Sequence, residues 1–246
     1  MTISVVIPTL NEERSLPTTL ARAVGLGFDE VIVVDGGSRD RTRQIVTELR
    51  VTSDALPVNP DCPPVTRHPS PVTLLTAPAG RAPQMNAGAA ASGGEIFLFL
   101  HADTLLPPDA RAAIERVLED PAYVGGRFDV RFERDSGLGR LIGRTINLRS
   151  RWTGIATGDQ AIFVRRPVFE RFGGFSDIPI MEDVDFTRRL KRIGRVAALR
   201  LQVVTSFRRW DASGPIRTIA LMWVLRFLYW VGISPRTLRH LYGAVR

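Results

Sequence analysis

The first 118 residues alternate short apolar runs with segments whose apolar side chains recur at helical spacing. The runs are continuously apolar, as expected of strands in a parallel sheet that helices cover on both faces. We expect strands at 3–7, 31–34, 72–75 and 96–100, and helices around 16–24, 45–49, 83–91 and 107–118. This order predicts an α/β fold with a central, mostly parallel sheet flanked by helices, which binds ligands at the carboxyl ends of its strands.

The pattern is less regular in the rest of the chain. Residues 51–71 contain six prolines and predict a long surface loop, which holds the single cysteine, Cys62. Beyond residue 118 we expect strands at 127–132 and 161–164, a basic helix at 138–149, and a helical segment from residue 215 onward. We find no internal repeat and expect one domain over residues 1–246.

Composition narrows the class of protein. The chain has 246 residues and a formal net charge of +8, which favours anionic partners. It has no run of five Lys or Arg and no interleaving of aromatic and basic residues, so we expect no nucleic-acid partner. The N-terminus lacks a signal-peptide pattern, and Arg217 and Arg226 interrupt the longest apolar stretch. We therefore expect a cytoplasmic protein without a membrane-spanning helix.

Polar residues follow three of the predicted strands. Pro8-Thr9-Leu10-Asn11-Glu12 follows the first, Asp35-Gly36-Gly37-Ser38 the second, and His101-Ala102-Asp103 the fourth. The carboxyl ends of parallel strands meet at one edge of the sheet, where a ligand binds. An acid such as Asp35 can accept hydrogen bonds from a ribose or a base, although it could equally cap the next helix. The three sets together favour a ligand site.

These segments resemble, in order and spacing, the motifs of glycosyltransferase family 2, which has the Rossmann-like GT-A fold. Residues 8–12 resemble its P-T-x-N-E opening, and residues 34–42 its V-D-D/G-G-S-x-D-x-T. Residues 101–103 occupy the place of its D-x-D, and Glu182-Asp183 resembles its late E-D motif. The resemblance, from residue 3 to about 195, implies a nucleotide-sugar-binding half at 1–103 and an acceptor half at 104–210. A C-terminal amphipathic helical segment, 211–246, follows.

Three further segments resemble a bacterial subgroup of the family that is associated with arsenosugar biosynthesis. They are Arg81-Ala82-Pro83-Gln84-Met85-Asn86-Ala87-Gly88, Leu100-His101-Ala102-Asp103-Thr104, and Gly232-Ile233-Ser234-Pro235. This resemblance implies an acceptor in arsenosugar or related small-molecule glycoside biosynthesis.

Family membership implies inverting transfer of a sugar from a nucleoside-diphosphate sugar, with a UDP-sugar favoured, to an acceptor that the sequence does not identify. Mn²⁺ or Mg²⁺ would neutralise the leaving diphosphate, and Asp103 is the expected ligand. His101 stands where the family often has Asp. An imidazole suits Mn²⁺ better than Mg²⁺, but a hydrogen bond to phosphate or a structural role is equally open.

The same resemblance implies roles for the other candidate residues. Asp183 is the expected base for the acceptor hydroxyl, with Glu182 orienting the acceptor or Asp183, although acids also favour the first turn of a helix. Asp159 and Arg209 are candidates for binding the acceptor or the diphosphate. The expected contacts to the nucleotide sugar are Pro8, Thr9, Leu10, Glu12, Asp35, Gly36, Arg81, Met85, Ala102 and Asp103.

The C-terminal segment leaves three interpretations open. Trp223, Phe227, Trp230 and the neighbouring arginines are consistent with a peripheral helix at the inner face of a membrane, a core helix, or a homodimer contact.

Two alternative functions stay open for the chain: a membrane-associated transferase with a lipid acceptor, and an inactive nucleotide-binding relative. A nicotinamide-dependent enzyme would need G-x-G-x-x-G after the first strand, and a nucleotidyltransferase a glycine-rich opening loop. The chain has neither.

Overall fold

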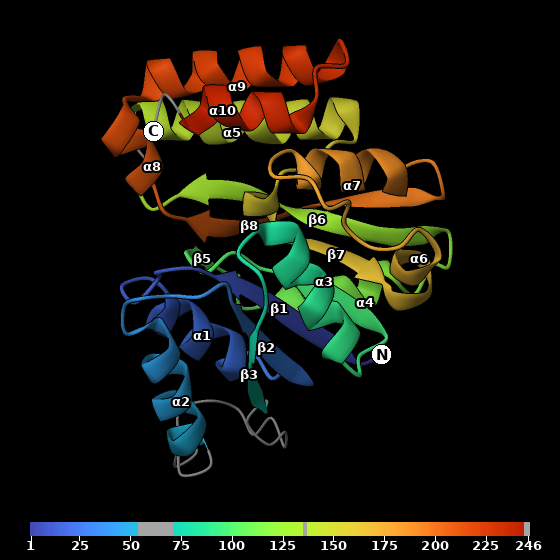
Figure 1. The fold of residues 1–246 in the computed structure, drawn as a ribbon. Helices are drawn as coiled ribbons and strands as arrows, with labels where there is room; N and C mark the ends of the chain where they lie inside the picture. The colour runs from blue at the N-terminus through green and yellow to red at the C-terminus, as the bar shows by residue number, and fades with distance from the viewer. Residues whose placement is uncertain (54–70, 135–136, 244–246) are drawn as a thin grey trace.

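The computed structural model describes residues 1–53, 71–134 and 137–243, and it is an α/β fold built on one eight-stranded sheet with the strand order β3-β2-β1-β4-β7-β6-β8-β5 (Figure 1). Most of the proline-rich segment expected to form a loop, with Cys62, lies outside the described residues. Its first three residues, 51–53, belong to the end of a helix instead.

The first half follows the predicted alternation closely. Strands β1 (Ile3–Thr9), β2 (Glu30–Asp35), β3 (Val72–Thr76) and β4 (Ile96–Phe99) pair in parallel. Helices α1 (Leu16–Gly25), α2 (Thr42–Ser53) and α3 (Arg81–Ala91) connect them. Asp40 accepts a hydrogen bond from the backbone N–H of Thr42, so Asp40 contacts the first turn of α2.

The second half contains a short strand and a long strand that the hydrophobic pattern did not reveal. These are β5 (Thr104–Leu105) and β8 (Arg195–Thr205), which pair with each other. Strand β5 ends before the predicted helix 107–118, and in the structure this helix, α4, begins at Ala110 and ends at Val117. The remaining elements are β6 (Tyr123–Phe132), α5 (Gly137–Thr153), the 3₁₀ turn η1 (Gly158–Gln160), β7 (Ile162–Arg165), α6 (Arg166–Arg171) and α7 (Glu182–Leu190).

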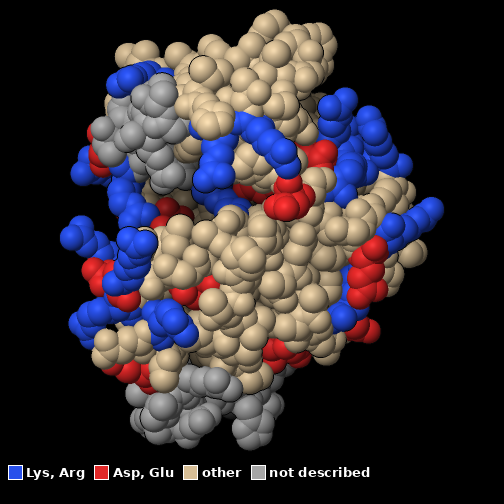
Figure 2. All heavy atoms as spheres, viewed as in Figure 1, with Lys and Arg blue, Asp and Glu red and all other residues tan. Residues whose placement is uncertain are grey.

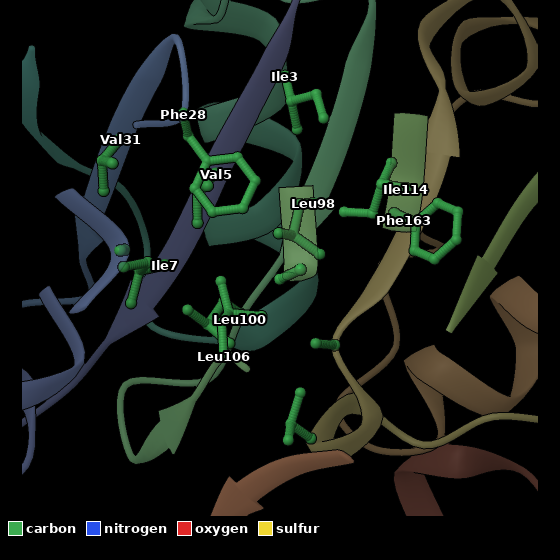
Figure 3. Packing of buried hydrophobic residues seen from close by; sticks show 14 of the residues in the cluster. Ile3, Val5, Ile7, Phe28, Val31, Leu98, Leu100, Leu106, Ile114 and Phe163 are labelled. Carbon is green, nitrogen blue, oxygen red and sulfur yellow. The ribbon is translucent and has the colours of Figure 1, made fainter. Parts of the chain in front are cut away.

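Alternate side chains of each central strand enter two different cores. Ile3, Val5 and Ile7 of β1 pack with α1 and α4 (Figure 3), whereas Val6 packs with α3 on the other face. Burial on both faces explains why these strands are continuously apolar. The second core also contains an aromatic group behind α7, in which the rings of Phe175 and Phe186 stack with centroids 4.2 Å apart. This group anchors the start of α7 against the sheet.

Three helices follow β8: α8 (Arg208–Ser213), α9 (Pro215–Trp230) and α10 (Pro235–Gly243). Figure 1 shows α9 and α10 as an outer layer beside α5 at the top of the view, whereas α2 lies at the bottom. Trp223, Phe227 and Trp230 of α9 are 62%, 60% and 75% exposed. Within the described parts of the chain, none of the helices has the length and apolar character needed to cross a bilayer.

Close approach of α3 to the sheet depends on Gly88. A Cβ atom at this position would overlap the side chain of Val6 and lie 3.0 Å from Cγ2 of Val34, and both valines are fully buried in the sheet. Gly25, at the end of α1, offers a matched contrast, because a Cβ there would meet no atom within 4 Å.

We therefore expect Gly88→Ala to lower the free energy of unfolding by about 1–3 kcal/mol through overpacking. Gly25→Ala should leave it unchanged or raise it slightly, because alanine favours a helix. Urea denaturation of both variants measures the difference. Equal stabilities for the two would show that α3 does not depend on this close approach.

Candidate active site

A cleft of about 580 Å³ opens at the carboxyl ends of β1 and β4, beside the first turn of α3. Helices α9 and α10 close its far side, through Arg217, Thr218 and Tyr242 among others. In Figure 2, basic side chains gather around a hollow between the α9–α10 layer and the sheet. Eight predicted residues line this cleft: Pro8, Thr9, Leu10, Glu12, Arg81, His101, Ala102 and Asp103.

Buried hydrogen bonds fix the two strand ends that border the cleft. The side-chain amide of Gln84, which is 3% exposed, donates to the carbonyl oxygens of Thr9 and Val34, both at 2.7 Å. The carboxylate of Asp35 accepts from the backbone N–H groups of Gly37 and Ser38 at 3.0 and 3.1 Å. Asp35 thus organises the turn after β2 and does not belong to the cleft lining, so its contact with the nucleotide stays a prediction, as does that of Gly36.

Arg208 joins the two acidic residues of the cleft. Its Nη2 lies 3.1 and 3.0 Å from the two carboxylate oxygens of Glu12 and 3.9 Å from Oδ2 of Asp103. The hydrogen bond that Arg208 donates to Glu12 raises the pKa of Arg208. An arginine in this position can bind phosphate oxygens with two N–H groups. The sequence pointed to its neighbour Arg209, whose side chain lies outside the described structure.

The donor groups next to the cleft fit a divalent cation that also binds phosphate. Across the described ranges, no three His, Cys, Asp or Glu side chains come together as a metal cage. Asp103 supplies hard carboxylate oxygen at the end of β4, and His101 lies two residues before it. A cation at Asp103 would therefore take most of its ligands from a diphosphate and water, as Mg²⁺ usually does.

Asp183 lies at the start of α7 and contacts the loop before β7. Its Oδ2 accepts a hydrogen bond from the backbone N–H of Gly158 at 2.7 Å, and Oδ1 accepts from that of Val184 at 2.7 Å. Met181, just before the helix, has φ of 68°, which turns the chain into α7. The ring of His101 packs directly against Gly158, with its Nε2 edge nearest to the loop.

Asp183 and Glu182 border a second, smaller cavity together with Met85, Gly158 and His101. His101 borders both this cavity and the larger cleft. Asp103 lines the cleft and Asp183 the smaller cavity, and His101 belongs to both linings. The cleft has room for a phosphate-bearing ligand, and the carboxylate of Asp183 can accept a hydrogen bond from a hydroxyl.

Glu182 is buried beside two charged groups. Burial, followed by the charge of Asp183, raises the pKa of Glu182 to about 7, while the nearby guanidinium of Arg81 acts in the opposite direction. Nη1 of Arg81 lies 3.6 Å from Oε1 of Glu182. The ion pair connects the nucleotide side of the site to α7.

Asp159 lies in η1, between Gly158 and the fully buried Gln160. Thr157 and Gln160 form a reciprocal capping arrangement that holds this turn. Oδ1 of Asp159 is buried without a hydrogen-bond partner in the described structure. Its predicted role toward an acceptor stays a prediction.

The fold is of the GT-A type, with a cleft at the carboxyl ends of β1 and β4. The sequence profile of "Glycosyl transferase family 2" matches residues 4–173, and the chain belongs to this family. Two solved structures, one from S. aureus and one from Pyrobaculum calidifontis, share the fold. TarS 1-349 in complex with UDP has a TM-score of 0.63 at 18% identity, covering 84% of this chain and 60% of that one. Mannosyltransferase PcManGT from Pyrobaculum calidifontis, in complex with GDP-Man and Mn2+, has a TM-score of 0.62 at 23% identity, covering 82% and 56%.

Curated relatives are more similar in sequence. "Probable glycosyltransferase YdaM" of Bacillus subtilis (strain 168) is 31% identical over 78% of this chain and 47% of its own length. "Undecaprenyl-phosphate 4-deoxy-4-formamido-L-arabinose transferase" of Pseudomonas paraeruginosa is 33% identical over 66% of this chain and 46% of its own length. The chain thus spans about half the length of these relatives.

Several residues of the cleft were not predicted from the sequence. Gln84 lies within a segment singled out for its resemblance, and its burial between two strand ends is the feature that the sequence did not show. Arg208, Arg217 and Tyr242 come from the C-terminal helices. They are remote in sequence from the strand ends that they face, and no local pattern marks them.

The ionisation of Glu182 predicts a pH-dependent stability. Because its folded-state pKa of about 7 exceeds the ordinary value of 4.5, folding favours the protonated form, and stability is lost as pH rises from about 4.5 to about 7. Glu182→Gln removes this titration. We expect the variant to gain on the order of 2–3 kcal/mol relative to the wild type between pH 5 and 8.

Urea denaturation at several pH values measures this gain. Glu170→Gln is the matched control, because the side chain of Glu170 is 59% exposed. A difference between Glu182→Gln and the wild type that stays constant with pH would contradict the raised pKa.

Proposed function

We propose that this protein is an inverting glycosyltransferase that uses a nucleoside-diphosphate sugar and a divalent cation, with Asp183 as the base. The observation that supports this most is the placement of Asp103 and Asp183 around His101, at the junction of the cleft and the smaller cavity. A donor in the cleft would present its anomeric carbon toward Asp183. Displacement from that side inverts the configuration at this carbon.

Asp103, Arg208 and Asp183 have different roles in the proposed reaction. A cation at Asp103 would neutralise charge on the leaving diphosphate, with Mn²⁺ favoured if His101 also binds it. Arg208, beside Glu12 and Asp103, can bind a phosphate oxygen. Asp183 accepts the proton of the acceptor hydroxyl, and its hydrogen bond from Gly158 orients the carboxylate.

The donor is proposed to be a UDP-sugar. The TarS structures with UDP and UDP-GlcNAc support a uridine nucleotide, whereas PcManGT binds GDP-Man. In this chain, the backbone of residues 8–10 and the side chain of Arg81 line the region where a base and ribose would fit.

The acceptor has two candidate classes. The arsenosugar-subgroup resemblance favours a small soluble acceptor, and its segments 81–88 and 100–104 do contribute to the site. The similarity to undecaprenyl-phosphate transferases favours a lipid acceptor. An inactive relative is disfavoured because Asp103 and Asp183 both border cavities.

An exposed apolar face supports the lipid alternative. It consists of the exposed apolar side chains of α5 and α9, namely Leu138, Leu141, Leu148, Trp152, Ile216, Trp223, Val224, Phe227 and Trp230. Helices α5, α9 and α10 contain no Asp or Glu, and arginines flank the face. Such a basic, aromatic face suits an anionic membrane surface, whereas pairing with a second copy would bring like charges together. We therefore propose a peripheral position at the inner face of the membrane.

Asp183→Asn should reduce sugar transfer by at least about 100-fold, because the amide cannot take the proton of the acceptor hydroxyl. It should leave nucleotide affinity within a few-fold. Asp103→Asn should instead weaken nucleotide binding in the presence of Mn²⁺ and leave metal-free binding unchanged. Calorimetry with UDP, with and without Mn²⁺, together with donor-consumption assays, separates the two roles. Transfer that survives in Asp183→Asn would remove Asp183 as the base.

We expect Trp223→Ser combined with Trp230→Ser to weaken binding to phosphatidylglycerol-containing vesicles by at least about tenfold, because each indole loses apolar burial. Co-sedimentation measures the binding. Ile193→Ser, an exposed apolar residue between α7 and β8, is the matched control and should bind as the wild type does. Vesicle binding that is insensitive to the tryptophans would argue against the proposed orientation.

A further inference from the structure

Arg149 of α5 is an inward-facing arginine whose charge is not fully satisfied. Its Nε and Nη2 atoms are both buried and have no hydrogen-bond partner in the described structure. Buried guanidinium N–H groups are costly to leave unpaired, so native structures normally give them a partner. Arg149 does not line the donor cleft, and the proposed mechanism does not use it.

The charged groups around Arg149 come from four elements. Burial, followed by the charge of Arg226 on α9, lowers the pKa of Arg149 to about 10. Asp159 of η1 and Asp183 of α7 act in the opposite direction, and Arg127 of β6 lowers it slightly. Arg127 is 2% exposed, and its own Nη2 is likewise buried without a partner. The positive charges of Arg149, Arg226 and Arg127 thus act on one another in the neighbourhood of Asp183, the proposed base.

The nearby carboxylates do not neutralise this cluster. Oδ1 of Asp159 is itself buried and unpartnered, although its charge acts on Arg149. Asp129 already forms ion pairs with Arg127 and with Arg151, and Nη2 of Arg151 lies 2.6 Å from Oδ2 of Asp129. Asp183 already accepts two backbone hydrogen bonds. Arg149 thus has buried donors and Asp159 a buried acceptor, and the two side chains act on each other through their charges without a hydrogen bond between them.

A ligand that carries both an oxyanion and a hydroxyl would satisfy both groups. The oxyanion accepts hydrogen bonds from the guanidinium of Arg149, with Arg226 as a second positive charge. The hydroxyl donates to Asp159. Arg226 of α9 is half-buried, and its charge acts on Arg149, so it can contribute the second positive charge.

We propose that Arg149 and Arg226 bind a phosphate-class oxyanion of the acceptor, beside Asp159 and Asp183. This site is separate from the donor diphosphate, which Arg208 serves in the larger cleft. The inference rests on the proposed function in that it assigns the ligand to the acceptor side. The phosphate can belong to a soluble phosphorylated metabolite or to a lipid headgroup, since the chemistry of recognition is shared.

The test measures phosphate binding while UDP and Mg²⁺ saturate the donor cleft. Inorganic phosphate is titrated against the full-length wild type, Arg149→Met, Arg149→Lys and Arg144→Met by calorimetry. Arg144 is exposed on the same helix and is the matched control. We expect at least about tenfold weaker binding for Arg149→Met, partial recovery for Arg149→Lys, and no change for Arg144→Met. Equal affinity in Arg149→Met and the wild type would overturn the proposal.

Thermal unfolding without phosphate separates this site from a purely structural role. Without a ligand, an unpaired buried charge adds little to stability. Arg149→Met should therefore have a Tm equal to or above that of the wild type. Phosphate should raise the Tm of the wild type and not that of Arg149→Met. A large loss of Tm in Arg149→Met without phosphate, with no phosphate effect on the wild type, would overturn the proposal.

Two further titrations identify the source of the phosphate. Tighter binding of glycerol 3-phosphate than of inorganic phosphate, dependent on Arg149, supports a soluble acceptor. Arg149-dependent binding to phosphatidate-containing vesicles supports a lipid headgroup. Failure of UDP to bind at all would contradict the proposed function, whereas normal UDP binding without a phosphate site would contradict this inference alone.

Discussion

The hydrogen bond from the backbone N–H of Gly158 to Asp183 holds the two sides of the site together. Gly158 also lies against the ring of His101, which follows β4 and borders the donor cleft. Three segments that are far apart in the sequence thus meet at one backbone position. A side chain at residue 158 would displace His101, so the distance between the donor cleft and Asp183 is set by the absence of a Cβ atom there.

Close packing of aromatic rings supports the contact between Gly158, His101 and Asp183. The rings of Phe99, Phe175 and Phe186 contact one another behind the start of α7, and Phe175 is further tied to α3 because its backbone N–H donates to Asn86. Helix α7 is therefore attached to the same core as the strands whose carboxyl ends border the cleft. Close aromatic packing limits rotation of α7, and the position of Asp183 depends on it.

The sequence predicted the parts of the molecule in which local pattern and tertiary structure agree. Strands β1 to β4 are buried on both faces, so their apolar runs are unmistakable, and the motifs at their ends follow directly. Strand β8 was missed because Arg195, Arg200 and Gln202 interrupt its apolar residues on its more exposed face. Arg208 and Arg149 were missed for a different reason: their importance lies in which distant groups they approach, and charge alone does not reveal a partner.

Helix α9 is apolar on both of its sides. Arg217, Thr218, Leu221 and Met222 line the cleft, while Trp223, Phe227 and Trp230 are exposed to the outside. The same helix therefore borders the cleft on one side and exposes an apolar surface on the other. An apolar phase that covers the exposed surface would also restrict the tilt of α9, and with it the shape of the cleft. The surroundings of the protein would then contribute to the geometry of its site.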